Sequence, residues 1–357
     1  MAKLNVGLIG VGRLGRVYAR DLSTRIGCTR LTAIADTDEA ALHRVRDEFG
    51  VPRAYPDSAE LFRDPSVDAI VIVTPTNTHR EVTVAAAAAR KPIFCEKPPS
   101  ISLDDAIAMR STVAESGVFF QLGFMRRFDS GYAAARARLD AGAIGDAVLF
   151  KSTSRDPYPP SLAYADPKSS GGLIIDMGIH DFDLARWFMG EVTSVQAIGG
   201  VLAYPDFATI GDIDNAVVSL VFSTGRLGVV DLTRNGIYGY DISTELLGTQ
   251  GTLRIGYLRE TPLLLMTREG VAHDTVPYFM ERFRDAYTAQ LENFAQNVLD
   301  GREPPVTVED GIEALRIAVA ATQARETALP VQLSSVRGAV GAAGEVNAGA
   351  GGASSSR

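Results

Sequence analysis

Two side chains that could transfer a proton, Asp176 and His180, stand four positions apart. They fall in the run from Leu173 to Trp187, which predicts one helix, so the spacing puts both on one helical face. An imidazole titrates near neutral pH and could take a proton from an alcohol, while a nearby carboxylate would orient the ring and stabilise its charged form. On spacing alone, an ion pair on the helix surface is the simpler explanation. For Asp183 we expect only a local role, as a cap or as a partner of Arg186.

A lysine that could stabilise negative charge, Lys97, follows the short apolar run from Pro92 to Cys95 and Glu96. That run predicts a buried strand, which Pro98 and Pro99 end because proline cannot donate to a sheet. The carboxyl ends of strands are where open α/β sheets bind ligands. The alternative is a surface lysine that closes a strand, since most charged side chains are solvated.

The chemistry that these groups fit together is hydride transfer from a secondary alcohol. The hydroxyl loses its proton to a base, for which His180 is the candidate, and the carbon loses a hydride to a nicotinamide. A fixed cation such as Lys97 would stabilise the developing alkoxide. The redox step would belong to the cofactor, and the protein would set the geometry.

A nucleotide-binding pattern opens the chain. The apolar run Leu4–Ile9 predicts a buried strand, and the glycines Gly10, Gly12 and Gly15 follow it directly before a helix predicted over 16–22. The first glycine permits a tight turn, the second lets the backbone approach a pyrophosphate, and the third lets the helix pack on the strand. The start of the helix would offer N–H groups to the phosphates.

The second predicted strand, Leu31–Ala35, ends at Asp36, which lies 21 residues after Gly15. An acid near this spacing typically binds the ribose 2′-hydroxyl, and its charge would repel a 2′-phosphate. Thr37 adds no positive charge, so NAD is favoured over NADP. The alternative is that Asp36 only caps the helix that begins near Asp38.

Alternating strands and helices continue to about residue 122 and predict a doubly wound parallel sheet, the α/β Rossmann arrangement. His79 stands at a helix start after one of these strands, where a histidine is more often a surface or capping residue than a catalyst. Its position at the carboxyl end of a strand still places it near the cofactor. The residues expected to contact NAD are Gly10, Gly12, Arg13, Leu14, Asp36, Thr37, Thr74, Pro75, Asn77, His79, Glu96 and Lys97.

After Gly123 the pattern changes from alternation to strands in succession, which predicts an α+β domain with a large open, mostly antiparallel sheet. Strands are expected near 192–203, 215–223, 226–233, 240–247 and 251–255, and helices near 281–299 and 308–326. The expected organisation is a Rossmann domain over 1–123, a substrate-binding and oligomerisation domain over 124–335, and a disordered Gly/Ala/Ser tail over 336–357.

Composition excludes several classes of protein. The chain has 357 residues, enough for two domains, and 46% of them are hydrophobic. A net charge of −8 without a basic run argues against nucleic acid as a partner. Two cysteines without metal-ligand spacing argue against a disulfide framework and a metal. No apolar run approaches a membrane span and no signal peptide is apparent, so a cytoplasmic location is expected.

The motifs together resemble one family. Gly10–Gly15, Glu96–Pro98, Gly171–His180 and the order of the two domains are similar to the Gfo/Idh/MocA family, over about residues 4–330. Within it, the chain is most similar to inositol 2-dehydrogenases. The segments that carry this closer resemblance are 124–132, 155–157, 238–241 and 281–287. Arg155-Asp156 and the loop over 157–170 depart from the pattern of some relatives.

The resemblance implies Lys97, Asp176 and His180 as the catalytic set, with His180 as the base. It also implies that Lys97, Arg127, Asp156, Asp176, His180 and Tyr238 contact a cyclic polyol. A structural role is open for each of the added residues: Arg127 could pair with Asp129, and Tyr238 could only pack. A homotetramer formed through the open sheet is implied as well.

Three alternative functions are compatible with these residues and with the resemblance. The first is NAD-dependent oxidation of an inositol to a keto-inositol. The second is oxidation of a pyranose such as glucose or L-glucose, whose ring of hydroxyls is similar. The third is a non-catalytic NAD-binding sensor, which is disfavoured because Lys97, Asp176 and His180 are all present.

Overall fold

Six parallel strands form the first sheet of the computed structural model, which describes residues 2–336. The strands are β1 (Leu4–Ile9), β2 (Thr29–Ala35), β3 (Arg53–Tyr55), β4 (Ala69–Ile72), β5 (Ile93–Glu96) and β6 (Phe120–Gly123). Their order in the sheet is β3-β2-β1-β4-β5-β6. This order, which reverses direction between β1 and β4, is typical of dinucleotide-binding sheets and creates a crevice at the carboxyl ends of those strands.

Five helices connect these strands: α1 (Arg13–Arg20), α2 (Glu39–Phe49), α3 (Ser58–Arg63), α4 (His79–Ala88) and α5 (Leu103–Ser116). Short turns of other helical types span Asp21–Arg25 and Thr76–Thr78. The helices begin where the sequence supplies caps, since Asp38 accepts a hydrogen bond from the N–H of Ala41 and Ser102 from that of Asp105. Strands β4 and β5 are buried along their whole length, as expected for a sheet covered on both faces.

The second domain contains a seven-stranded sheet in the order β12-β11-β7-β10-β9-β8-β15. Its strands are β7 (Ala147–Arg155), β8 (Val192–Gly200), β9 (Asn215–Phe222), β10 (Leu227–Thr233), β11 (Asp241–Gly248), β12 (Thr252–Ile255) and β15 (Val331–Gln332). In the described chain, β7 and β10 pair in parallel and the other neighbours pair antiparallel. The predicted fold class, a Rossmann domain followed by a mostly antiparallel open sheet, is confirmed.

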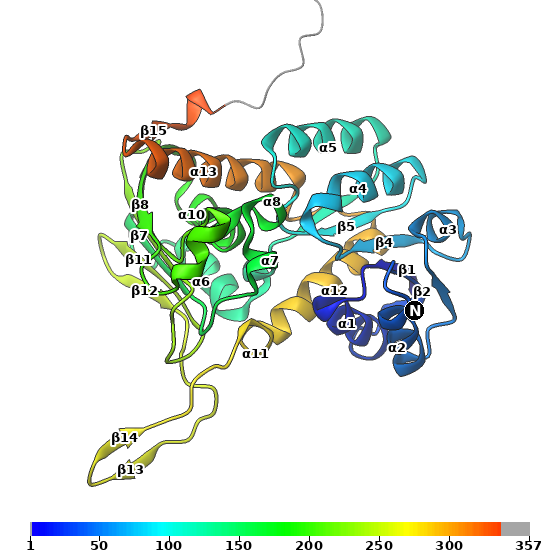
Figure 1. Ribbon diagram of the computed structural model, residues 1–357, viewed down its shortest axis with the longest axis horizontal. Coiled ribbons are helices and arrows are strands. Elements are labelled where there is room, and N and C mark those ends of the chain that lie inside the picture. The colour runs from blue at the N-terminus through cyan, green and yellow to red at the C-terminus, as the bar shows by residue number, and fades with distance from the viewer. Residues whose placement is uncertain (1, 337–357) are drawn as a thin grey trace, which may run out of the picture.

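The helices of the second domain gather on one side of its sheet (Figure 1). They are α6 (Ser130–Asp140), α7 (Leu162–Ala165), α8 (Pro167–Ser170), α9 (Gly172–Asp176), α10 (Ile179–Met189), α11 (Phe279–Arg282), α12 (Arg284–Asp300) and α13 (Val308–Thr327), with 3₁₀ turns at Met125–Phe128, Pro205–Ile210 and Leu333–Ser335. Buried and exposed residues alternate along β9, so one sheet face packs on helices and the other is open. Ile198, Val217 and Leu227 are among the exposed apolar residues of the sheet strands.

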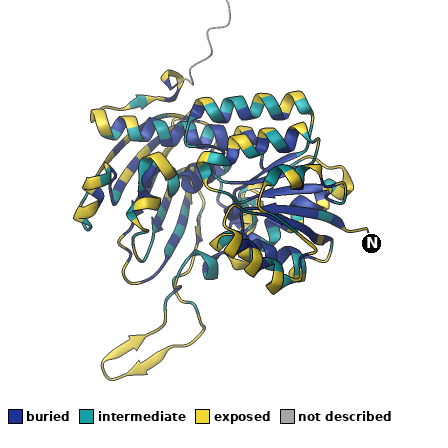
Figure 2. Ribbon diagram, turned by 45° about the vertical axis from the view of Figure 1, so that its right-hand side comes forward, coloured by how far each residue is buried: buried dark blue, intermediate teal, exposed yellow. Residues whose placement is uncertain are grey.

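The C-terminal helix α13 joins the two domains. Helix α13 packs on β8 and α10 of the second domain and on α5 and β6 of the first. A side chain at Gly311 would come within 2.4 Å of Leu122 and 3.0 Å of Pro99, so glycine permits the close contact with the cofactor domain. Thr307 and Asp310 form a reciprocal cap that determines where α13 begins. The buried core therefore continues from one domain into the other (Figure 2).

The structure corrects three expectations. The helix predicted over 173–187 is two helices, α9 and α10, separated at Met177 and Gly178. A side chain at Gly178 would come within 2.5 Å of the carbonyl oxygen of Ile174, so the turn depends on glycine. An arm containing β13 (Leu265–Thr267) and β14 (Gly270–Ala272) projects from the body and was not predicted, because its strands are too short for a periodic signal (Figure 1). Val336, placed in the predicted tail, is buried against the folded part.

The rest of the predicted tail, residues 337–357, lies outside the described residues. None of the helices in the described part of the chain has the length and apolar character needed to span a membrane.

Candidate active site

The glycine loop after β1 has the geometry that a dinucleotide needs. Gly10 adopts a φ of +88°, and a side chain there would meet the carbonyl oxygen of Val73 at 2.6 Å. A side chain at Gly15 would lie 2.0 Å from the carbonyl oxygen of Gly10, so the helix packs too closely on the loop for any other residue. Gly12 opens onto space with no atom within 4 Å, and it begins α1 without a side-chain cap. The first N–H groups of α1 can therefore receive a phosphate.

Asp36 lies at the end of β2 beside this loop. Its carboxylate accepts hydrogen bonds from the N–H of Val11 at 2.7 Å and from the N–H of Asp38 at 2.9 Å. Asp38, not Asp36, caps α2, so the capping alternative is wrong. A carboxylate has about four lone-pair sites, which leaves acceptors for ribose hydroxyls. Exposed Thr37 follows it. The loop and Asp36 thus fit NAD.

The loop after β4 carries Thr74, Pro75 and Asn77, of which Pro75 and Asn77 are exposed. His79 is buried, with Nδ1 2.8 Å from the carbonyl oxygen of Pro98 and Nε2 2.9 Å from that of Thr74. The surface alternative for His79 is therefore wrong. Both ring nitrogens face backbone carbonyl oxygens, so His79 lies between the loops after β4 and β5 and does not present a nitrogen to solvent. Burial lowers the pKa of His79, and the neutral ring donates to one of the two oxygens.

Arg13 and Leu14 open α1. The Arg13 guanidinium lies 5.7 Å from the ring centre of Tyr278 and 5.3 Å from that of Phe279, both in the second domain. Leu14 is half-buried against the core. The start of α1 thus lies beside the second domain and carries a positive charge.

Lys97 lies between the two domains. Its Nζ is 3.0 Å from the carbonyl oxygen of Asp176 and 3.5 Å from the Oδ1 of the same residue. Both side chains are largely buried, with 18% and 12% of their surface exposed. The alternative of an ordinary surface lysine is therefore wrong, because the ammonium is held against the end of α9.

The Asp176 carboxylate has further partners that the sequence did not indicate. Its Oδ1 accepts from the Tyr164 hydroxyl at 3.2 Å, and its Oδ2 lies 3.6 Å from Nη2 of the buried Arg234. In the described structure no hydrogen bond joins Asp176 to His180. Because the helix breaks between them, the two are not the i, i+4 pair that the spacing predicted.

Asp156 and Arg234 lie near Lys97 and Asp176, and the four side chains form what we call the Lys97 cluster. The parallel pairing of β7 and β10 brings the first two there. Arg155 pairs with Thr233 at the ends of the two strands, so the residues that follow leave the sheet at one edge. Burial raises the pKa of Asp156 to about 7, against the opposing effect of Arg234. Arg234 was not predicted because strand register is not visible in a sequence. Its place at a strand end, before Asn235 and Gly236, was the available signal.

His180 lies in the first turn of α10, with its ring edge-to-face against Phe124 at 6.1 Å. Only 8% of the residue is exposed, and Nδ1 is buried without a partner among the described residues. Burial, and then the positive charges of Lys97 and Arg126, lower the pKa of His180 well below its ordinary value. The imidazole is therefore neutral at pH 7 and able to accept a proton.

A buried network supports the start of α10. Asp181 accepts a hydrogen bond from Nη1 of Arg126 at 2.7 Å and from the hydroxyls of Ser152 and Ser154 at 2.6 and 2.8 Å. Ser152 and Ser154 lie on the helix-covered face of β7. Because Asp181 follows His180 directly, this network positions the His180 backbone.

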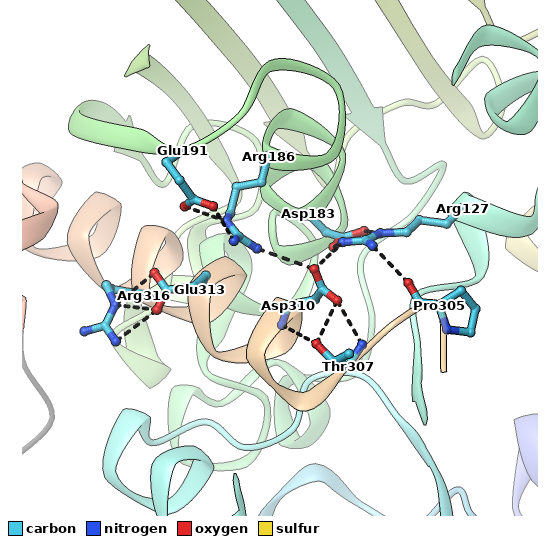
Figure 3. Close-up of polar contacts among 9 residues, drawn as sticks. All are labelled: Arg127, Asp183, Arg186, Glu191, Pro305, Thr307, Asp310, Glu313 and Arg316. Carbon is cyan, nitrogen blue, oxygen red and sulfur yellow. Dashed lines mark hydrogen bonds and ion pairs between the residues drawn. The ribbon is translucent and has the colours of Figure 1, made fainter. Parts of the chain in front are cut away.

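Arg127 does not join the Lys97 cluster. Figure 3 shows its guanidinium directed at Asp183 and Asp310, with Nε–Oδ2 and Nη2–Oδ1 distances to Asp183 of 2.9 and 2.5 Å and an Nη2–Oδ1 distance to Asp310 of 2.9 Å. The expected alternative partner is also corrected, since Asp129 pairs with Arg282 at 2.8 Å. Arg127 therefore links the 3₁₀ turn after β6 to α10 and α13.

Replacement of Arg127 by methionine is expected to lower the free energy of unfolding by about 3–5 kcal/mol, because buried Asp183 would lose its charged partner. Urea unfolding followed by circular dichroism measures this. Arg16→Met, which breaks an exposed pair with Glu48, is the control and should change little. Full stability combined with a raised KM for a polyol would instead make Arg127 the substrate contact that the resemblance implied.

Tyr238 lies on the other side of the second sheet. Its hydroxyl accepts from Nη1 of Arg155 at 2.8 Å and donates to Oδ2 of Asp241 at 2.8 Å. Neighbouring residues of a strand point to opposite faces of the sheet. Ser154 of β7 points to the helix-covered face, where it bonds Asp181, so Arg155 and its partner Tyr238 lie on the open face. Within one chain, the structure therefore separates Tyr238 from the Lys97 cluster, and its role is more than packing.

Both domains match a known protein family. Residues 4–124 match the profile described as the oxidoreductase family, NAD-binding Rossmann fold, and residues 136–333 match the C-terminal alpha/beta domain of the same family. The chain belongs to the Gfo/Idh/MocA oxidoreductase family. The resemblance stated from the motifs is confirmed, as are NAD as the cofactor and the assignment as an NAD-dependent dehydrogenase.

Individual relatives are similar over nearly the whole chain. A scyllo-inositol 2-dehydrogenase (NAD(+)) of Bacillus subtilis is 38% identical, covering 95% of this chain and 99% of the relative. A myo-inositol 2-dehydrogenase of Thermotoga maritima is 41% identical over 94% and 100%. The crystal structure of scyllo-inositol dehydrogenase from Lactobacillus casei with NAD(H) and scyllo-inositol has a TM-score of 0.88 at 32% identity, covering 93% of this chain and 100% of that one.

Proposed function

We propose that this protein oxidises a secondary hydroxyl of a cyclic polyol, an inositol, to the corresponding ketone with NAD. The observation that carries the proposal is the meeting of Lys97 from the cofactor domain with Asp176 from the second domain, beside a neutral His180. The similarity to enzymes named scyllo- and myo-inositol 2-dehydrogenases supports the substrate class.

The residues that would hold NAD are those of the glycine loop, with Asp36 accepting from the ribose and the loops after β4 and β5 beside them. When bound, NAD supplies the hydride acceptor. Arg13 at the start of α1 would add positive charge for the phosphates.

Lys97 and His180 divide the work on the reacting hydroxyl. The ammonium of Lys97 donates to the reacting oxygen and stabilises negative charge as it develops there. His180, kept neutral by burial and by neighbouring cations, accepts the hydroxyl proton. Asp176 keeps Lys97 in place through its carbonyl and carboxylate oxygens, instead of orienting His180 as the spacing suggested.

The charge of the cluster suits an uncharged substrate. Lys97 and Arg234 supply two positive charges, and Asp176 with Asp156 opposes them. Carboxylate oxygens accept hydrogen bonds from hydroxyls, so Asp156 and Asp176 are the groups that we assign to polyol hydroxyls.

The decisive experiment follows NADH absorbance with myo-, scyllo- and D-chiro-inositol, D-glucose and L-glucose, each with NAD and with NADP. We expect an inositol to give the highest kcat/KM, with NAD preferred because Asp36 repels a 2′-phosphate. A higher kcat/KM for either glucose would favour the sugar dehydrogenase, and preference for NADP would contradict the role of Asp36. Activity on none of the five would overturn the substrate class.

We propose a homotetramer as the working assembly, formed through the open face of the second sheet. Exposed apolar side chains support this, among them Ile198 and Leu227 on the sheet strands and Leu265 and Met266 on the arm. Light scattering is expected to give four times the 38.1 kDa chain mass, and a monomeric mass would contradict the assembly. The cytoplasmic location stays a prediction.

A further inference from the structure

A buried carboxyl group next to Lys97 is not used by the mechanism above. Glu96, the last residue of β5, is only 5% exposed, and its Oε2 accepts a hydrogen bond from the backbone N–H of Lys97 at 3.2 Å. Gly123 at the end of β6 leaves room for it, because a side chain there would come within 2.9 Å of the Glu96 Oε1. The carboxyl therefore points into the protein, away from solvent.

Two helices from different domains hold this carboxyl. The Tyr18 hydroxyl of α1 donates to the Glu96 Oε1, and Nε2 of Gln290 on α12 lies 2.5 Å from the Tyr18 hydroxyl and 3.3 Å from the same Oε1. Tyr18 and Gln290 are completely buried. Gln121 of β6 donates in turn to the carbonyl oxygen of Gln290 at 3.4 Å. The helix that begins at the glycine loop is thus connected to the second domain through Glu96.

We propose that Glu96 is a positioning residue for Lys97, and that its carboxyl, held between α1 and α12, couples the orientation of Lys97 to the packing of the two domains. This inference rests on the proposed function, in which Lys97 polarises the reacting oxygen. Glu96 itself touches neither the reacting oxygen nor Asp176 and acts through the backbone and charge of its neighbour.

The same carboxyl changes charge in the neutral range. Burial raises the pKa of Glu96 to about 7, against the opposing effects of Tyr18 and Lys97. The titratable groups that face it are Tyr18 from α1, Tyr287 from α12, and Cys95 and Lys97 from β5 and the loop after it. Burial raises the pKa of Tyr18, Tyr287 and Cys95, so these three stay neutral near pH 7 and Glu96 is the member of this group that titrates there.

Both charge states can be satisfied by hydrogen bonds. The ionised carboxylate accepts from Tyr18, Gln290 and the N–H of Lys97. If Glu96 is protonated, it can donate to the Tyr18 oxygen. Rotation of the Gln290 amide would then bring its Oε1, which is buried without a partner in the described structure, to the place of Nε2, where it could accept from the Tyr18 hydroxyl. The ionised state accepts from the Lys97 N–H and attracts the Lys97 charge, so we take it as the active state.

The test compares pH profiles of kcat/KM between pH 5.5 and 8.5, with an inositol as the substrate. The wild type is expected to lose activity as the pH falls through about 7 because of Glu96. Glu96→Gln should lower kcat/KM on the high-pH plateau by about tenfold to hundredfold. It should also remove the decrease of kcat/KM toward low pH, which we call the acid limb of the profile. Tyr18→Phe removes a donor to the carboxylate and should move the limb to higher pH by about one unit. The matched control is Tyr55→Phe, which removes a hydroxyl that donates to Asp64 and not to Glu96. It should leave the limb in place.

An unchanged limb in Glu96→Gln, or a limb that Tyr18→Phe leaves in place, overturns the inference. Asp156 is the competing group, since burial raises its pKa to about 7 as well, and a limb that disappears only in Asp156→Asn assigns the titration to Asp156 and overturns the role of Glu96. If Glu96→Gln does not fold, Tyr18→Phe decides.

An assay without substrate separates this inference from the proposed function. Because the folded pKa of Glu96 lies above its unfolded value, its stabilising contribution is complete at low pH and is lost as the pH rises to about 7. The difference in unfolding free energy between wild type and Glu96→Gln should therefore change between pH 5 and pH 8. If no inositol is oxidised but this difference appears, the proposed function fails while the titration of Glu96 stands; a constant difference overturns the inference.

Discussion

Lys97→Met is expected to lower kcat/KM by about a thousandfold, with the fold and NAD binding retained. The loss follows from the position of the ammonium, which is 3.0 Å from the Asp176 carbonyl oxygen and is held at the junction of the two domains. Removal of one preorganised donor to a developing oxyanion typically costs between a hundredfold and a thousandfold. Steady-state NADH formation gives kcat/KM, and NADH fluorescence titration measures cofactor binding separately.

Lys3→Met, at an exposed position before β1, is the control and should retain full activity. The decrease in Lys97→Met should appear mainly in kcat, because the interaction strengthens as charge develops on the oxygen. If kcat is preserved and only KM rises, Lys97 binds the substrate but does not stabilise the transition state. Unchanged activity would sink the catalytic role altogether.

His180→Gln is expected to lower kcat by about a hundredfold to ten-thousandfold, the range over which a general base typically contributes. Glutamine retains a polar side chain of similar size but cannot accept the hydroxyl proton. The matched control is His43→Gln, at an exposed position on α2, which should behave as the wild type. Activity that is recovered at high pH in His180→Gln, where hydroxide replaces the base, would support the assignment.

The pH dependence of His180 has a definite sign. Its pKa lies well below the ordinary value because of burial, followed by Lys97 and Arg126, so the neutral base is present above that lowered pKa and is lost only as the pH falls through it. His180 therefore adds no limb at pH 6.5–7. A limb near neutral pH belongs to Glu96 or Asp156, whose pKa values burial raises to about 7. A limb at pH 6–7 that persists in both Glu96→Gln and Asp156→Asn and disappears in His180→Gln would contradict this assignment.

Several features built from nearby residues were predicted correctly from the sequence, although the helix over 173–187 was not. The glycine loop depends on backbone conformation and close approach within a few positions, so the spacing of Gly10, Gly12 and Gly15 was enough to predict it. The position of Asp36 beside that loop agrees with its distance along the chain, while its contact with ribose stays a prediction. The strand before Lys97 was found by its short apolar run and its terminating prolines, and β5 does lie beside β4 in the parallel sheet.

Features that depend on pairing between distant segments were not predictable in the same way. Asp156 and Arg234 lie at one edge because β7 and β10 pair in parallel in an otherwise antiparallel sheet, and no local pattern states that pairing. The spacing of Asp176 and His180 predicted a shared helical face, whereas the break at Gly178 turns Asp176 toward Lys97, 79 positions away.

Polar side chains give the clearest contrast between sequence and structure. Arg127, Tyr238 and His79 have residue types suited to binding, yet packing commits each of them to other partners: Asp183 and Asp310, Arg155 and Asp241, and two backbone carbonyls. Which partner a buried charge acquires depends on which helices and strands enclose it, because a buried charge without a partner is too costly to persist. Local sterics and periodicity therefore determined the glycine loop, while the packing of the two domains decided which polar groups gather around Lys97.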